Sequence, residues 1–109
     1  MKFTYRKSEN KNKNRIEFWI DNFDYVDGID YIAQIFSEKF GMKISEKIEG
    51  IYFDVIKLNS DEIEYHLMWD EDIGTLIYSI AQDSISLERL ENELSVVLKC
   101  LNEKLKNIP

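Results

Sequence analysis

Apolar and polar residues alternate along several stretches of the chain, and this two-residue period predicts β-strands. In residues 15–20, the side chains of Ile16, Phe18 and Ile20 fall on one face. Residues 62–69 place Ile63, Tyr65, Leu67 and Trp69 on one face and leave the other to Glu62, Glu64, His66 and Met68. Further alternation predicts strands over 2–7, 42–48, 51–58 and 75–81.

Short segments of turn-forming residues separate these strands. Glu49-Gly50, Asn59-Ser60-Asp61 and the acidic segment 70–74 favour tight turns, and the wholly polar residues 8–14 favour a loop. Short connections of this kind join antiparallel neighbours. We therefore expect a mostly antiparallel sheet of about five to six strands.

Two helices are expected from three- and four-residue spacing of apolar side chains. The first covers about 28–40, with Asp27 as N-cap and Gly41 as the left-handed residue that ends it. The second covers 86–107, with Ser86 as N-cap and a hydrophobic staple between Ile85 and Leu90. Its apolar stripe comprises Leu87, Leu90, Leu94, Val97, Leu101 and Leu105.

The predicted element order is β-β-α-β-β-β-β-α, which indicates an α+β fold with both helices packed on one face of the sheet. The chain has 109 residues, a length typical of one domain, so we assign residues 1–109 to a single domain. The uncovered face is then a candidate interaction surface of mixed character. It is expected to carry Trp19, Tyr52, Asp54, Glu64, His66 and Met68.

The formal charge of −7 narrows the classes of partner. It disfavours direct binding to nucleic-acid phosphates and to anionic membranes, and it favours rapid association with basic proteins. Acidity also promotes solubility alone, so charge by itself leaves both interpretations open. A single cysteine, Cys100, and the lack of an apolar leader lead us to expect a reducing, cytoplasmic location.

Catalytic and metal-binding patterns are weak in this sequence. His66 is the only histidine and lies near Glu64, whereas Cys100 falls in the expected second helix. One His and one Cys do not supply a usual zinc set, and the acidic segments around residues 21–27 and 70–72 do not match the twelve-residue calcium loop. We therefore expect a chain that is not an enzyme and has no cofactor or metal.

Acidic residues beside aromatic ones form the candidate partner-binding surface. Such a composition suits a surface that binds a basic protein. The alternative is that Trp69 belongs to the core and the acids only solvate the hairpin tips. The candidate residues are Asp21, Asp24, Glu64, Trp69, Asp70, Glu71 and Asp72.

Two segments give the chain a resemblance to a known class of proteins. They are Tyr25–Ile32, which enters the first helix, and Leu67–Leu76, which is followed by a strand and a long terminal helix. With the small size and acidity, they resemble the immunity proteins of bacterial polymorphic toxins and contact-dependent growth inhibition systems. This resemblance implies a cytosolic inhibitor that binds a cognate toxin, often a nuclease. It implies no role for any particular residue.

The sequence thus supports two hypotheses about function. The first is an immunity-type inhibitor that neutralises a basic toxin through acidic side chains. The second is an acidic secretion chaperone that binds an effector protein as a dimer, with the helix 86–107 as its seam. The oligomeric state and the partner's identity are left open at this point.

Overall fold

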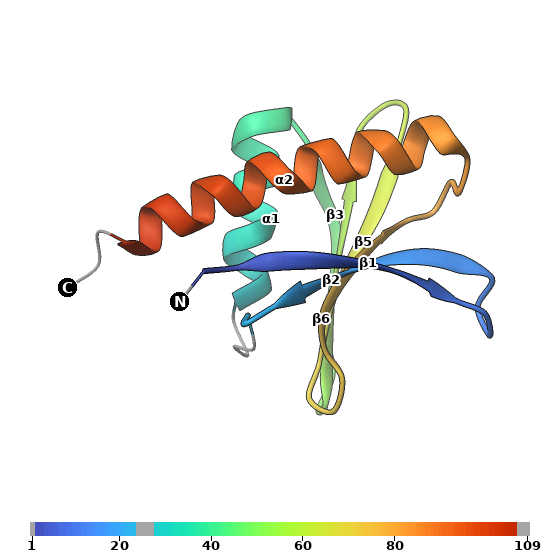
Figure 1. The fold of residues 1–109 in the computed structure, drawn as a ribbon, viewed down its shortest axis with the longest axis horizontal. Coiled ribbons are helices and arrows are strands. Elements are labelled where there is room, and N and C mark those ends of the chain that lie inside the picture. The colour runs from blue at the N-terminus through green and yellow to red at the C-terminus, as the bar shows by residue number, and fades with distance from the viewer. Residues whose placement is uncertain (1, 24–27, 107–109) are drawn as a thin grey trace.

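The computed structural model describes residues 2–23 and 28–106, and it has the predicted α+β architecture (Figure 1). Six strands and two helices follow one another in the expected order. The strands are β1 (Thr4–Asn10), β2 (Arg15–Asp21), β3 (Lys43–Glu49), β4 (Phe53–Asn59), β5 (Glu64–Asp70) and β6 (Gly74–Ser79). The helices are α1 (Gly28–Phe40) and α2 (Ser84–Lys106).

All six strands form one antiparallel sheet in the order β1-β2-β6-β5-β4-β3. Consecutive hairpins join β3 to β4, β4 to β5 and β5 to β6, and these four strands form a meander. A separate N-terminal hairpin joins β1 to β2. The two hairpin units meet where β2 pairs with β6, through Phe18–Ile77, Trp19–Leu76 and Ile20–Thr75. The long-range β2–β6 pairing places the N-terminal hairpin beside the end of the meander.

Both helices cover the same face of this sheet, as predicted (Figure 1). Directly opposed residues of an antiparallel pair share a face, so the row Phe18, Ile77, Leu67 and Ile56 runs across four strands toward the helices. All four side chains are fully buried. They meet Ile32 and Phe36 of α1 and Leu90, Leu94 and Val97 of α2 in one hydrophobic core.

Helix α1 ends where the sequence predicts. Gly41 has a φ of 66°, and its N–H donates to the carbonyl of Ser37 at 3.0 Å. A residue without a Cβ adopts this left-handed conformation at little cost, so glycine stops the helix cleanly. The predicted N-cap, Asp27, lies outside the described residues.

The start of α2 differs from the prediction. The N-cap is Asp83, not Ser86: its Oδ1 accepts the N–H of Ser86 at 2.8 Å, and its Oδ2 accepts the Ser86 hydroxyl at 2.9 Å. These hydrogen bonds lower the pKa of the Asp83 carboxyl. Ile85 is 80% exposed and forms no staple with Leu90. Asp and Ser are both favoured N-cap residues, so the sequence alone does not decide between Asp83 and Ser86, which lies three positions later.

The largest changes in strand boundaries lie at the end of β1 and between β3 and β4. β1 continues to Asn10, three residues beyond the expected strand 2–7, so residues 8–10 of the expected loop pair with residues 15–17 of β2. The expected strand 51–58 begins only at Phe53, and residues 51 and 52 belong to the turn. The N–H of Gly50 donates to the carbonyl of Phe53 at 2.7 Å and closes this turn. Asp54 also lies on the helix side, opposite Trp69, rather than on the uncovered face. Alternation gives the period of a strand but does not show where its pairing stops.

Candidate functional site

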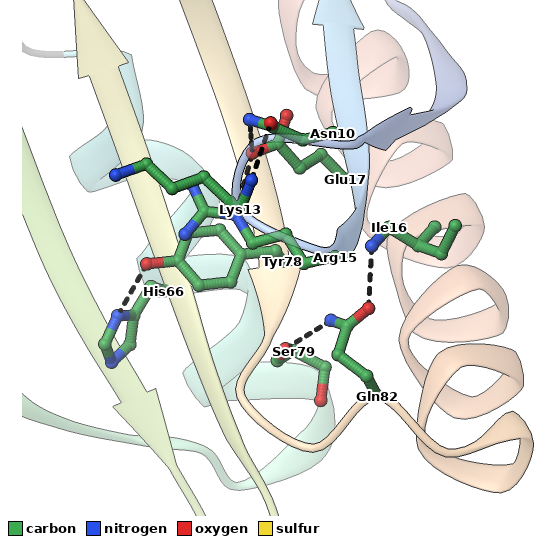
Figure 2. Close-up of polar contacts among 9 residues, drawn as sticks. All are labelled: Asn10, Lys13, Arg15, Ile16, Glu17, His66, Tyr78, Ser79 and Gln82. Atoms are coloured by element: carbon green, nitrogen blue, oxygen red, sulfur yellow. Dashed lines mark hydrogen bonds and ion pairs between the residues drawn. The ribbon is translucent and has the colours of Figure 1, made fainter.

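The face of the sheet that the helices leave uncovered, here called the open face, carries a polar network across the four strands β1, β2, β6 and β5 (Figure 2). Glu17 of β2 is only 3% exposed, and its Oε2 accepts hydrogen bonds from Arg15 Nε at 2.8 Å and from Asn10 Nδ2 at 3.1 Å. The Arg15 guanidinium lies 3.7 Å from the centre of the Tyr78 ring on β6. The Tyr78 hydroxyl in turn meets His66 Nδ1 of β5 at 3.1 Å.

His66 is held within this network through both ring nitrogens. Its Nε2 lies 2.6 Å from Glu64 Oε2. Its Nδ1 lies within hydrogen-bond distance of the Tyr78 hydroxyl. Both ring nitrogens are thus engaged with side chains of neighbouring positions on the open face. The arrangement therefore orients side chains on the open face.

Cys100 lies on the other side of the sheet from His66. It belongs to α2, where it is half-buried and packs against the core. The sheet separates the two side chains that the sequence offers as candidates for catalysis. Among residues 2–23 and 28–106, no cluster of His, Cys, Asp and Glu is placed to hold a metal ion.

The acidic candidates separate into distinct places. Asp70, Glu71 and Asp72 gather at the β5–β6 turn, which projects away from α2 at the bottom of Figure 1. Asp70 shapes this turn, because its Oδ1 accepts the N–H groups of Asp72 at 2.8 Å and Ile73 at 3.3 Å. Glu71 and Asp72 remain exposed.

Asp21 lies near the base of the same hairpin. It follows Ile20, which is paired with Thr75 just after the turn. Its Oδ1 accepts a hydrogen bond from Arg6 Nε at 2.9 Å, and Arg6 lines a shallow groove of about 540 Å³ that reaches Ile73. Asp21 is therefore linked through Arg6 to a groove on the open face whose lining includes Trp19 and Ile73.

The other three candidates do not join this group. Glu64 lies at the opposite end of β5, roughly 20 Å away at about 3.3 Å per strand residue. Trp69 is 8% exposed and belongs to the hydrophobic core on the helix side, so it offers no exposed aromatic surface. Asp24 lies outside the described residues.

The apolar part of this region was not predicted from the sequence. Ile51, Tyr52 and Phe53 are 86%, 64% and 41% exposed, and Ile73 is 55% exposed. The N–H of Glu71 donates to the carbonyl of Tyr52 at 2.8 Å, which ties the two turns together. We call residues 50–53 and 70–74 the hairpin end. The sequence signal was Gly50 directly before three bulky apolar residues, since such residues are unusual in a turn.

Neither helix in the described part of the chain is long and apolar enough to cross a membrane. No family model, curated protein or solved structure matches this chain.

Proposed function

We propose that this chain is an immunity-type inhibitor, which binds a basic protein toxin and neutralises it. The observation that carries the proposal is the gathering of Asp70, Glu71 and Asp72 at one projecting tip, with Asp21 near its base. Carboxylates presented in this way can occupy the substrate groove of a nuclease, where phosphates would otherwise bind. A nuclease is accordingly the favoured class of toxin.

The charge of the whole chain supports the same partner chemistry. A formal charge of −7 steers a basic protein toward the chain, and a concentrated acidic tip orients the encounter. The steering acts on the rate of association and decreases as salt screens the charges. An inhibitor that must reach its toxin before the toxin acts benefits from such a rate.

The chemistry of the open face supports binding rather than catalysis. His66 uses both ring nitrogens within the chain, and Cys100 lies beyond the sheet. Nucleophilic catalysis needs a nucleophile within hydrogen-bond reach of its base. These two side chains do not supply that pair.

A dimeric secretion chaperone is the alternative, and no observation favours it. Its expected seam was the apolar stripe of α2. Leu90, Leu94 and Val97 are fully buried and Leu101 is 2% exposed, all within the chain's own core. A dimer interface on α2 would have to be formed by the remaining, more polar surface of that helix.

The direct test uses the protein encoded beside the gene for this chain. We expect its expression to arrest growth, co-expression of this chain to restore growth, and the two purified proteins to form a one-to-one complex. Calorimetric titration measures the complex, and colony counts measure the protection. A neighbouring protein that arrests growth but neither binds this chain nor is neutralised by it would contradict the proposal.

A further inference from the structure

The β3–β4 turn exposes three consecutive bulky apolar side chains, Ile51, Tyr52 and Phe53. Turns of this kind are usually built from Gly, Pro, Asn, Asp and Ser, which satisfy the backbone without exposing apolar surface. The core does not use Ile51 or Tyr52, which are 86% and 64% exposed. Ile73, at the tip of the adjacent turn, adds a fourth exposed apolar side chain. Folding therefore does not account for this apolar surface.

The patch is held in place by its backbone. The hydrogen bond from Gly50 N–H to the Phe53 carbonyl closes one turn, and that from Glu71 N–H to the Tyr52 carbonyl fixes it against the other. Asp70 holds the second turn through the N–H groups of Asp72 and Ile73. A surface that is already ordered loses little conformational entropy when a partner covers it.

Gly50 contributes to this order through close packing. A Cβ at position 50 would lie 2.7 Å from Cε1 of Phe53, closer than such atoms approach in proteins. The Phe53 ring therefore lies directly over the glycine. Phe53 is 41% exposed, so part of it remains at the surface.

Charge identifies the kind of partner that fits this patch. Asp70, Glu71 and Asp72 border it, and the sequence contains no Lys or Arg between Lys57 and Arg89. Arg6 and Lys11 line the groove that reaches Ile73, and Arg6 is paired with Asp21 at 2.9 Å. The nearby Lys47 is already paired with Asp30 at 2.9 Å and with Glu49 at 3.2 Å. A second copy of the chain would bring the same acidic border against itself, which like-charge repulsion opposes.

We propose that Ile51, Tyr52, Phe53 and Ile73 are the apolar anchors of an interface with a different protein. The partner's docking surface has an apolar pocket bordered by Lys or Arg side chains. Apolar anchors enclosed by polar contacts are the usual source of affinity in protein interfaces, whereas the surrounding charges set orientation and rate. This inference rests on the proposed function for the identity of the partner, which is the neighbouring toxin.

The test compares Tyr52→Ser with Tyr31→Ser. Both tyrosines are 64% exposed, but Tyr31 lies on α1 rather than at the hairpin end. Ile73→Ser is compared in the same way with Ile85→Ser, since Ile85 is an exposed isoleucine on α2. The probe is the purified neighbouring protein, titrated by calorimetry into each variant after its thermal unfolding has been shown to match the wild type.

We expect Tyr52→Ser and Ile73→Ser each to weaken binding by about tenfold or more, and the two control variants to change it by less than about twofold. Wild-type affinity in both hairpin-end variants would overturn the anchor proposal and leave the proposed function standing. No binding by the wild-type chain would overturn both. A wild-type dimer that Tyr52→Ser dissociates would overturn the assignment in favour of a second copy.

Discussion

At the scale of single residues, the Tyr65 hydroxyl makes a buried hydrogen bond between the sheet and α2. Tyr65 is fully buried, and its hydroxyl donates to Glu93 Oε1 at 2.7 Å. Glu93 is 8% exposed, and its other oxygen accepts from Arg89 Nε at 3.0 Å. The carboxylate is thus held by two donors from β5 and α2. Removing one donor leaves a buried charge short of a partner.

Tyr65→Phe tests this contact. We expect it to lower the free energy of unfolding by about 1–2 kcal/mol near neutral pH, because Glu93 loses a buried hydrogen bond. Urea unfolding measures the difference, provided that the slope of free energy against urea is unchanged. Tyr31→Phe is the control, since it removes a hydroxyl from an exposed ring. An equal, small effect of both substitutions would contradict the assigned role.

The same pair of side chains gives a pH dependence with a definite sign. The pKa of Tyr65 is raised above its usual value of 10.0, mainly by burial and to a smaller extent by the hydrogen bond to Glu93. Above about pH 10 the unfolded chain releases this proton and the folded chain keeps it, so the stability of the wild type falls. The stability gap between wild type and Tyr65→Phe should therefore narrow as the pH rises. A gap that widens would show that the shift has the opposite sign.

At the scale of elements, local chemistry identified most of the fold. The alternation in residues 15–20 and 62–69 and the stop at Gly41 correspond to β2, β5 and the end of α1. The local errors include the cap of α2, the first residues of β4 and the end of β1, which continues through three residues of the expected loop 8–14. For the α2 cap the sequence offers two acceptable residues, Asp83 and Ser86, whereas the ends of the strands depend on where the pairing with a neighbouring strand stops.

The candidate site was harder to predict from the sequence than the fold was. Asp21 approaches the β5–β6 turn only because β2 pairs with β6, and 53 positions separate Asp21 from Gly74 along the chain. The network from Arg15 through Tyr78 to His66 depends on the same pairing. A pattern with a period of two residues says which side chains share a face of one strand. It does not say which distant strand lies beside it.

Gly41→Ala tests the local explanation of how α1 ends. A Cβ at position 41 would meet no other atom within 4 Å, so the φ of 66° is the only obstacle to alanine. We expect a loss of about 1 kcal/mol in the free energy of unfolding, the cost of a left-handed conformation for a residue with a Cβ. Gly41→Asn should lose less, because asparagine tolerates this conformation better. Stability equal to the wild type in Gly41→Ala would show that the stop does not depend on glycine.

At the scale of the whole molecule, the fold separates two tasks. One face of the sheet, with both helices, forms the core, whereas the open face and the hairpin end keep polar and apolar groups exposed. Glu71 and Asp72 at the tip are exposed and adjacent in sequence, so their electrostatic potentials add at this projecting turn. The proposed function depends on this combination.

The most direct test of the proposed function is the rate of association with the neighbouring protein at increasing salt. The test variant is Glu71→Gln with Asp72→Asn at the tip, and the matched control is Asp61→Asn with Glu88→Gln at exposed positions elsewhere. Each pair removes two negative charges and changes the formal charge from −7 to −5. Stopped-flow mixing measures the rate constant from low to high salt.

We predict that the wild type and the control associate rapidly at low salt and slow steeply as salt is added. The tip variant should associate about tenfold more slowly at low salt and depend less on salt. Identical rates and salt dependence in the tip variant and the control would contradict the proposed function of the tip, because the partner would then respond only to total charge.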